Sequence, residues 1–252
     1  MKALITGASS GIGLEMAKVL DKRDCELILV ARSKEDLEKV QKTLSSKTKI
    51  IVKDLSKEDN VKELYNETKN ENIDILINNA GFGACGYFET ISLDKELEMI
   101  NTNVKAVHIL TKLFLNDMIK RDSGYILNVS SSASFMPGGP LMATYYSTKS
   151  YVTELTNSIW YELKEKKSNV SISCLCPGPV DTNFNKVANV KFSVKPMDAN
   201  VVAEYAINKM FKKKRLIIPG FTIRFVKSFS KFLSDKSLLR MTYNVQEKKI
   251  KK

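Results

Sequence analysis

The alternation of short apolar runs with helical patterns constrains the fold most strongly, because it continues along most of the chain. The apolar runs predict strands over 3–6, 26–30, 49–52, 73–77, 125–129, 170–175 and 215–218. Parallel strands need long crossover connections, and the intervening helical segments supply them. We therefore expect an α/β fold, a doubly wound and mostly parallel sheet with helices on both faces. The 252 residues suffice for one such domain.

The cysteine and histidine content argues against a metal centre or a secreted, disulfide-bonded protein. Cys174 and Cys176 share one face of a predicted strand, but they have no Cys or His cluster beside them to complete a zinc site. Cys25 and Cys85 lie elsewhere, and His108 is the only histidine. No signal-peptide pattern or membrane-spanning apolar run is present. We expect reduced cysteines in a cytoplasmic protein without a metal.

The last 41 residues carry most of the net charge of +12, because 212–252 contain 13 Lys and Arg but only two acids. Phe225, Phe229 and Phe232 recur there at helical spacing among basic residues, which predicts a basic amphipathic helix. We divide the chain into a catalytic domain, 1–220, and an extension, 221–252. Packing or self-association is the preferred role of the extension, a weak membrane-surface contact is the alternative, and no nucleic-acid motif accompanies the charge.

A glycine-rich turn joins the first predicted strand to the first predicted helix. Glycine lets a backbone turn sharply and approach a pyrophosphate, and the helix amino terminus then faces the phosphates. The turn predicts a dinucleotide site comprising Gly7, Ser9, Ser10, Gly11, Ile12 and Gly13.

The end of the second strand predicts which dinucleotide binds. NAD sites of this type place an acid there for the ribose 2′-hydroxyl. This chain has no acid at that point and carries Arg32, whose guanidinium suits a 2′-phosphate. The sequence favours NADP(H) over NAD(H).

These and later motifs, taken together over about residues 2–220, resemble the short-chain dehydrogenase/reductase family. The motifs are TGASSGIG at 6–13, Asp54-Leu55, Asn78-Asn79-Ala80-Gly81, a serine cluster at 130–132, Tyr145-x-x-x-Lys149 and Pro177-Gly178-Pro179. The resemblance implies a Rossmann-like sheet of seven parallel strands and an oxidoreductase that moves hydride between a nicotinamide and a carbonyl or alcohol carbon. It also implies a homo-dimer or tetramer.

The resemblance assigns further residues to the cofactor and to a proton relay. Asp54 and Leu55 are expected beside the adenine, and Asn103 is expected to position a relay water. The remaining expected cofactor contacts are Asn79, Ala80, Gly81, Pro177, Gly178, Val180 and Thr182.

Tyr145 and Lys149 are the predicted acid–base pair. They lie four residues apart in a helical stretch, so their side chains share one face. A nearby ammonium is expected to lower the phenol pKa, which suits Tyr145 to exchange a proton with the substrate oxygen. The family resemblance adds that Lys149 contacts the nicotinamide ribose. The neighbouring Tyr146 breaks the family spacing and is expected to line the pocket or pack.

A serine is expected to donate a hydrogen bond to the developing oxyanion, and two candidates remain. The position after the fifth strand selects Ser131, whereas the usual spacing back from Tyr145 selects Ser132. We prefer Ser131, because a strand fixes geometry more firmly than a loop does.

The predicted substrate side is apolar. Residues 183–196 are expected to cover the substrate, with Phe135, Met136, Leu141 and Met142 on the opposite wall. A hydrophobic ketone, aldehyde or secondary alcohol is therefore the expected substrate. A non-catalytic dinucleotide-binding protein, docked through its basic tail, is the alternative, and the Asn103, serine, Tyr145 and Lys149 set argues against it.

Overall fold

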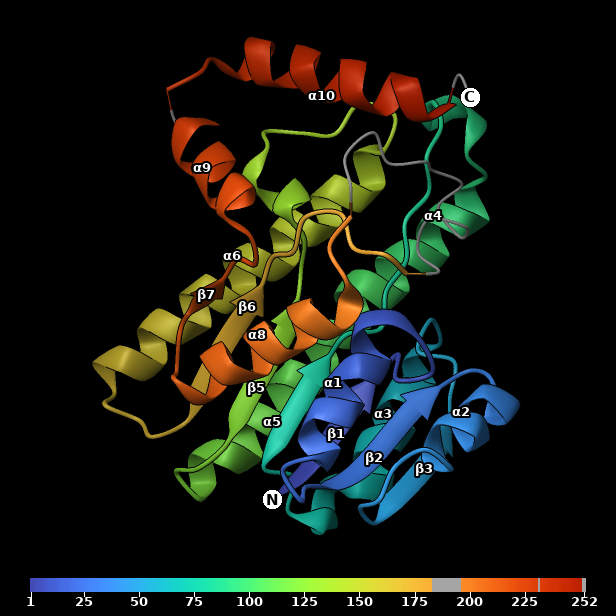
Figure 1. Ribbon diagram of the computed structural model, residues 1–252, viewed down its shortest axis with the longest axis vertical. Coiled ribbons are helices and arrows are strands. Elements are labelled where there is room, and N and C mark those ends of the chain that lie inside the picture. Colours follow the sequence, from blue (N-terminus) through green and yellow to red (C-terminus); the bar gives the residue numbers. More distant parts are fainter. Residues whose placement is uncertain (183–195, 231, 251–252) are drawn as a thin grey trace.

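The computed structural model describes residues 1–182, 196–230 and 232–250. Its strands form one parallel sheet in the order β3-β2-β1-β4-β5-β6-β7, which confirms the predicted fold class (Figure 1). The strands are β1 (Lys2–Thr6), β2 (Glu26–Ala31), β3 (Thr48–Val52), β4 (Ile75–Asn78), β5 (Tyr125–Val129), β6 (Ser171–Leu175) and β7 (Leu216–Ile217). The strand order reverses between β1 and β4, which is where doubly wound sheets bind ligands.

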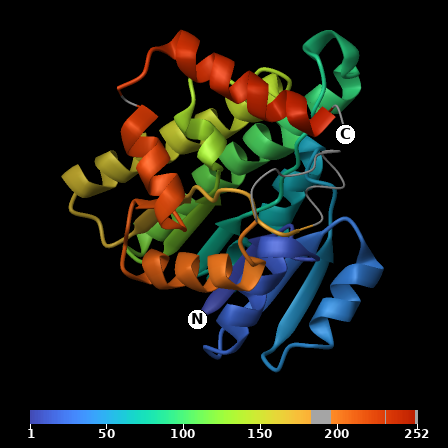
Figure 2. The same ribbon diagram turned by 45° about the horizontal axis from the view of Figure 1, so that its top comes forward.

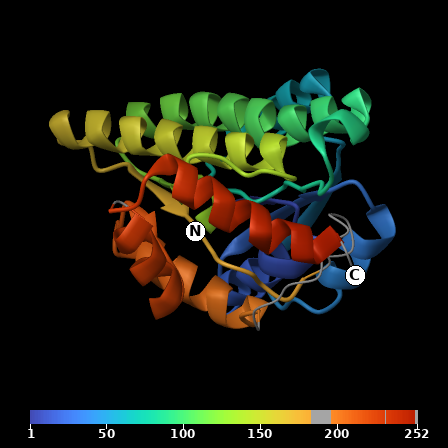
Figure 3. The same ribbon diagram turned by 90° about the horizontal axis from the view of Figure 1, so that it is seen from above.

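Helices cover both faces of the sheet (Figure 3). The α-helices are α1 (Gly11–Asp21), α2 (Lys34–Gln41), α3 (Glu58–Thr68), α4 (Leu93–Ile100), α5 (Val107–Lys120), α6 (Ala143–Glu165), α8 (Ala199–Phe211), α9 (Phe221–Ser230) and α10 (Asp235–Ile250). Short 3₁₀ segments are η1 (Lys69–Glu71), η2 (Phe88–Thr90) and η4 (Ser132–Phe135). Helices α1, α2 and α8 pack on one face, and α3, α5 and α6 pack on the other.

Strands β1, β2, β4, β5 and β6 are buried on both faces, which explains why they read as nearly continuous apolar runs, whereas the edge strand β3 is partly exposed. In β1, Ala3 and Ile5 face the α1 and α8 side, whereas Leu4 faces the α5 side. A helical pattern over 93–120 does not form one helix, because a π-helix, η3 (Asn101–Ala106), separates α4 from α5. Such insertions are frequent at functional sites.

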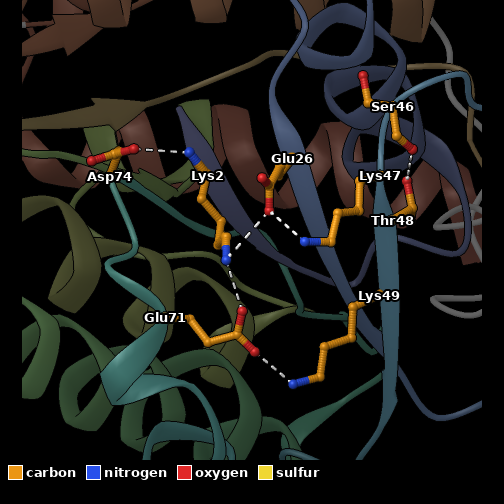
Figure 4. Close-up of polar contacts among 8 residues, drawn as sticks. All are labelled: Lys2, Glu26, Ser46, Lys47, Thr48, Lys49, Glu71 and Asp74. Carbon is orange, nitrogen blue, oxygen red and sulfur yellow. Dashed lines mark hydrogen bonds and ion pairs between the residues drawn. The ribbon is translucent and has the colours of Figure 1, made fainter.

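A network of charged side chains joins strands β1, β2 and β3 (Figure 4). The Lys2 ammonium lies 2.8 Å from a Glu71 carboxylate oxygen and 3.4 Å from a Glu26 oxygen. Lys49 binds Glu71 at 2.7 Å, and Lys47 lies 3.5 Å from Glu26. These pairs hold the pKa of Glu71 to about 2, mainly through the Lys2 hydrogen bond, and they fasten the amino ends of the strands.

The basic extension forms two helices, and the second was not predicted. Helix α9 packs through Ile223, and α10 runs across the top of the molecule in Figure 1. Leu238, Thr242 and Gln246 lie on the buried face of α10. In Figure 2, where the top of the molecule is turned forward, α10 crosses in front of the helices drawn in green. In the described parts of the chain, no helix is both long and apolar enough to cross a bilayer.

Candidate active site

The glycine-rich turn has the backbone that its sequence predicts. Gly7 and Gly11 adopt φ values of +65° and +56°, which side chains with a Cβ rarely adopt. Gly13 has no positive φ, but a Cβ there would collide with Asn79 Nδ2 and the Gly7 carbonyl oxygen. Gly7 and Gly11 therefore allow the sharp turn, and Gly13 allows close packing against Asn79.

The turn is held against the end of β4 by hydrogen bonds. Asn79 Nδ2 donates to the carbonyl oxygens of Thr6 and Gly7, each at 3.0 Å. The Thr6 hydroxyl accepts from the main-chain N–H groups of Asn79 and Ala80, again at 3.0 Å. Helix α1 has no acid in its first turn to compete for an anion. Its amino terminus can therefore receive a diphosphate.

Arg32 lies at the far end of the same cavity, just beyond β2. Its side chain is exposed, and Nη1 lies 3.0 Å from the Glu98 carboxylate. A guanidinium has five N–H donors, so this ion pair leaves donors for a 2′-phosphate. Ser33 caps α2 through a hydrogen bond from the Asp36 N–H, and both residues line the cavity. The guanidinium of Arg32, the hydroxyl of Ser33 and the carboxylate of Asp36 therefore all lie at this end of the cavity.

Asp54 and Leu55 also border this end of the cavity. Burial raises the pKa of Asp54, but hydrogen bonds from Ser56 outweigh it and leave the pKa below its ordinary value. The Ser56 N–H donates to Asp54 Oδ1 at 3.0 Å. The carboxylate is thus held ionised, as an acceptor suited to polar N–H groups of a base or ribose hydroxyls.

Asn103 lies in the π-helix and is fully buried. Its Nδ2 donates to the Phe82 carbonyl oxygen at 2.8 Å and to the Thr148 hydroxyl at 3.1 Å, while Oδ1 accepts from the Phe82 N–H at 3.1 Å. Both amide hydrogens are engaged, so the side chain anchors the Phe82 segment to α6. The predicted role in holding a relay water stays a prediction.

The serine cluster separates into distinct roles. Ser130 donates to the Lys149 carbonyl oxygen at 2.7 Å and accepts from Thr153 at 2.8 Å, which places it in the core. Ser131 forms a hydrogen bond with Tyr145 and accepts from the Ala133 N–H at 3.1 Å. Ser132 lines the cavity, and its N–H is bound to the Pro177 carbonyl oxygen. The contact with Tyr145 favours Ser131 over Ser132.

Tyr145 and Lys149 project from α6 toward the same cavity. Lys149 Nζ lies 5.9 Å from the centroid of the Tyr145 ring and donates to the Val129 carbonyl oxygen at 3.0 Å. Burial lowers the pKa of Lys149 to about 8. Burial also raises the pKa of Tyr145 to about 12, against the opposite effect of Ser131. The expected lowering by Lys149 is not found, because desolvation of the phenolate dominates.

The cavity that joins these residues has a volume of about 590 Å³. That volume is typical of a site for a small molecule or cofactor. All of the residues predicted to bind the dinucleotide line it except Gly13, which packs behind the turn. The lining residues absent from the sequence prediction include Ser33, Asp36, Lys53, Phe82, Thr102, Val245 and Gln246.

The substrate side agrees only in part with the sequence prediction. Of the four residues of the predicted wall, Met142 lines the cavity. Phe135 packs against a core cluster, Leu141 is buried outside the lining, and Met136 is not a lining residue. Tyr146, which was expected either to line the pocket or to pack, lines the cavity. Of the predicted cover over 183–196, residues 183–195 lie outside the described residues. Val245 and Gln246 of α10 border this side, and no periodic pattern in the sequence indicated them.

Comparisons with known proteins show which family this chain resembles. A family model described as short chain dehydrogenase matches residues 1–191. Hydroxysteroid dehydrogenase-like protein 1 of Gallus gallus is 32% identical to this chain. The match covers 87% of this chain and 67% of that protein. Very-long-chain 3-oxoacyl-CoA reductase of Anas platyrhynchos is 34% identical over 75% of the chain, and the match spans 63% of that relative.

Solved structures show the same fold at lower sequence identity. A short-chain dehydrogenase from Sphingobium yanoikuyae in complex with NADPH is 24% identical, with a TM-score of 0.82 over 92% of this chain and 93% of the other. A short-chain dehydrogenase/reductase from Burkholderia phymatum in complex with NAD is 22% identical, with a TM-score of 0.81 over 92% and 94% of the two chains. The likeness therefore extends past the residues that the family model matches.

Proposed function

Since the chain belongs to the short-chain dehydrogenase/reductase family, we propose that this oxidoreductase is an NADP(H)-dependent carbonyl reductase or alcohol dehydrogenase acting on a hydrophobic substrate. The observation that carries the proposal is the contact between Ser131 and Tyr145, with Lys149 5.9 Å from the tyrosine ring, in the cavity that begins at the glycine turn. A protein that only bound a dinucleotide would have no need of this group.

The residues of the chain divide the reaction between them. A bound nicotinamide supplies or accepts the hydride. Tyr145 holds its proton at neutral pH, because its pKa is about 12, and it gives that proton to the carbonyl oxygen as negative charge develops there. Ser131 supports the same oxygen by hydrogen bonding. Lys149 has three N–H donors, so its bond to Val129 leaves others for the nicotinamide ribose.

The preference for NADP(H) is supported by Arg32 and its surroundings. The guanidinium stands where an NAD site of this type has an acid, and the amino terminus of α2 lies beside it. A phosphate there would accept from Arg32 and face the positive end of that helix. The carboxylates of Asp36 and Glu98 would repel the phosphate. The preference for NADP(H) therefore depends on the N–H donors that the Arg32 guanidinium offers to it.

Replacing Tyr145 with Phe tests the proposed function. The substitution removes the proton donor and keeps the ring, so turnover of hydrophobic ketones with NADPH should fall by about 100-fold to 10,000-fold. NADPH fluorescence titration should give nearly the wild-type Kd. Turnover equal to that of the wild type would refute the catalytic role of Tyr145, and absence of NADPH binding in the wild type would refute the proposal as a whole.

Features outside the cavity support three further parts of the proposal. No disulfide joins the four cysteines, which suits a cytoplasmic location. Exposed apolar side chains on α4 and α6, including Leu93 and Tyr161, suit a homo-dimer or tetramer. The aromatic outer face of α9 suits contact with an anionic membrane surface, since it lies in the basic segment 212–252.

A further inference from the structure

The end of the cavity proposed for the 2′-phosphate holds acids as well as a cation. Arg32 lines it together with the carboxylates of Asp36 and Asp54. Lys53 lines the cavity too, but its ammonium lies 2.7 Å and 2.9 Å from two carboxylates of α3, which balance its charge. A phosphate at this end therefore gains its main attraction from Arg32, and an acid that competes for that guanidinium weakens the attraction.

Glu98 of α4 is the acid that competes for the Arg32 guanidinium. Its Oε1 accepts a hydrogen bond from Arg32 Nη1 at 3.0 Å, across 66 positions of sequence. Asp36 instead lies 3.8 Å from the Lys39 ammonium of its own helix. The side chains of Arg32 and Glu98 are 66% and 40% exposed, so a ligand in solution can reach the pair. An ion pair this exposed adds little to the stability of the fold, which Glu98 can therefore lose without unfolding.

The Glu98 carboxylate acts against a bound phosphate in two ways. It occupies an N–H donor of Arg32 from which a phosphate oxygen could otherwise accept a hydrogen bond. It also places a negative charge beside the guanidinium that the phosphate must approach, and like charges at such a short range repel each other. The ribose 2′-hydroxyl of NAD(H) carries no charge, so the repulsion falls on NADP(H) and spares NAD(H).

We propose that Glu98 determines how strongly this protein prefers NADP(H), because it holds the Arg32 guanidinium and repels the 2′-phosphate. The inference rests on the proposed function, in which Arg32 binds that phosphate. It gives a specificity-determining role to a residue of α4 that lies outside the cavity lining. Glu98 reduces the preference without reversing it, because the guanidinium keeps other N–H donors for the phosphate.

Removing the charge of Glu98 at constant size tests the inference. In Glu98→Gln the Kd for NADPH should fall by about threefold to tenfold, and the Kd for NADH should stay at the wild-type value. Glu98→Asp keeps the charge and should gain no affinity for NADPH. Fluorescence titration with each reduced cofactor measures these Kd values without a substrate. Turnover of ketones by the wild type therefore remains a separate test of the proposed function.

Ionic strength separates an effect of charge from an effect of shape. Added salt should shrink the gain of Glu98→Gln for NADPH, because salt screens exposed charges. Glu165→Gln is the matched control, since it removes the same charge from an exposed residue at the opposite end of α6 from Tyr145. It should bind both cofactors as the wild type does. An unchanged or higher Kd for NADPH in Glu98→Gln, or an equal gain for NADH, overturns the inference.

Discussion

At the scale of single residues, the cofactor preference depends on one guanidinium. Arg32→Ala should raise the KM for NADPH by about tenfold to 100-fold, because a charge-assisted contact to the 2′-phosphate is lost. The KM for NADH should change little. Steady-state kinetics with both cofactors measures the difference, and Arg23→Ala is the control, since Arg23 is an exposed arginine that binds Asn208. An equal loss for both cofactors would contradict the assignment.

The pH dependence of carbonyl reduction follows from Lys149. Burial lowers its pKa from 10.5 to about 8, so the side chain is charged below that pH and neutral above it. The charged form has one more N–H donor than the neutral amine, and it is the form that we propose holds the nicotinamide ribose beside Tyr145. At saturating NADPH, kcat for reduction should be constant near pH ~7 and fall as the pH rises through ~8. Lys149→Arg keeps the charge and should move the fall upward, whereas a wild-type rate unchanged to pH ~10 would be inconsistent with this role.

Single residues also differ in how far sequence can predict them. Tyr145 and Lys149 share one helix, so their spacing alone places both on one face. The choice between Ser131 and Ser132 depends on the turn into η4, which spacing does not determine. Gln246 reaches Tyr146 only because α10 folds back over the cavity, and no local pattern encodes that contact.

At the scale of elements, the glycine turn and β4 act as one unit through Asn79. Gly13→Ala would place a Cβ against Asn79 Nδ2 and the Gly7 carbonyl oxygen. Such overpacking should lower the free energy of unfolding by about 1–3 kcal/mol and the Tm by several degrees. It should also weaken NADPH binding, because the turn shifts.

Thermal denaturation and NADPH titration together measure the effect of Gly13→Ala. Gly86→Ala is its control, because a Cβ there would meet side-chain ends of Ile91 and Thr90 at 3.3 Å, which can move. A Gly13→Ala protein with the stability and NADPH affinity of the wild type would show that the turn tolerates the extra carbon.

The predicted strands agree with the structure to within two residues, since their apolar runs are distinct, but two helical features escaped the sequence. The apolar spacing over 93–120 continues through the π-helix, so periodicity does not reveal the break at Asn101–Ala106. Helix α10 was missed because its buried face mixes Leu238 with the polar Thr242 and Gln246. The sequence of α10 therefore lacks the apolar stripe by which a helix is predicted.

At the scale of the whole molecule, α9 separates a packed face from an exposed aromatic face. Ile223 packs against the end of β6 and β7, whereas Phe221, Phe225 and Phe229, one turn apart, are 76%, 59% and 51% exposed. Arg224 lies on the exposed side, within a segment that is strongly basic. Aromatic side chains beside cations suit the interface of an anionic bilayer, where the rings enter the headgroup region and the cations attract the lipid.

Vesicle sedimentation tests this contact. The protein should sediment with vesicles that contain an anionic phospholipid and remain in solution with zwitterionic vesicles, and added salt should release part of it. The double variant Phe225→Glu, Phe229→Glu should bind at least about tenfold more weakly, because each ring loses its burial in the interface. Leu93→Glu changes another exposed apolar residue, on α4, and should bind as the wild type does. Protein that stays in solution with anionic vesicles at low salt would exclude the membrane contact and leave self-association as the use of this face.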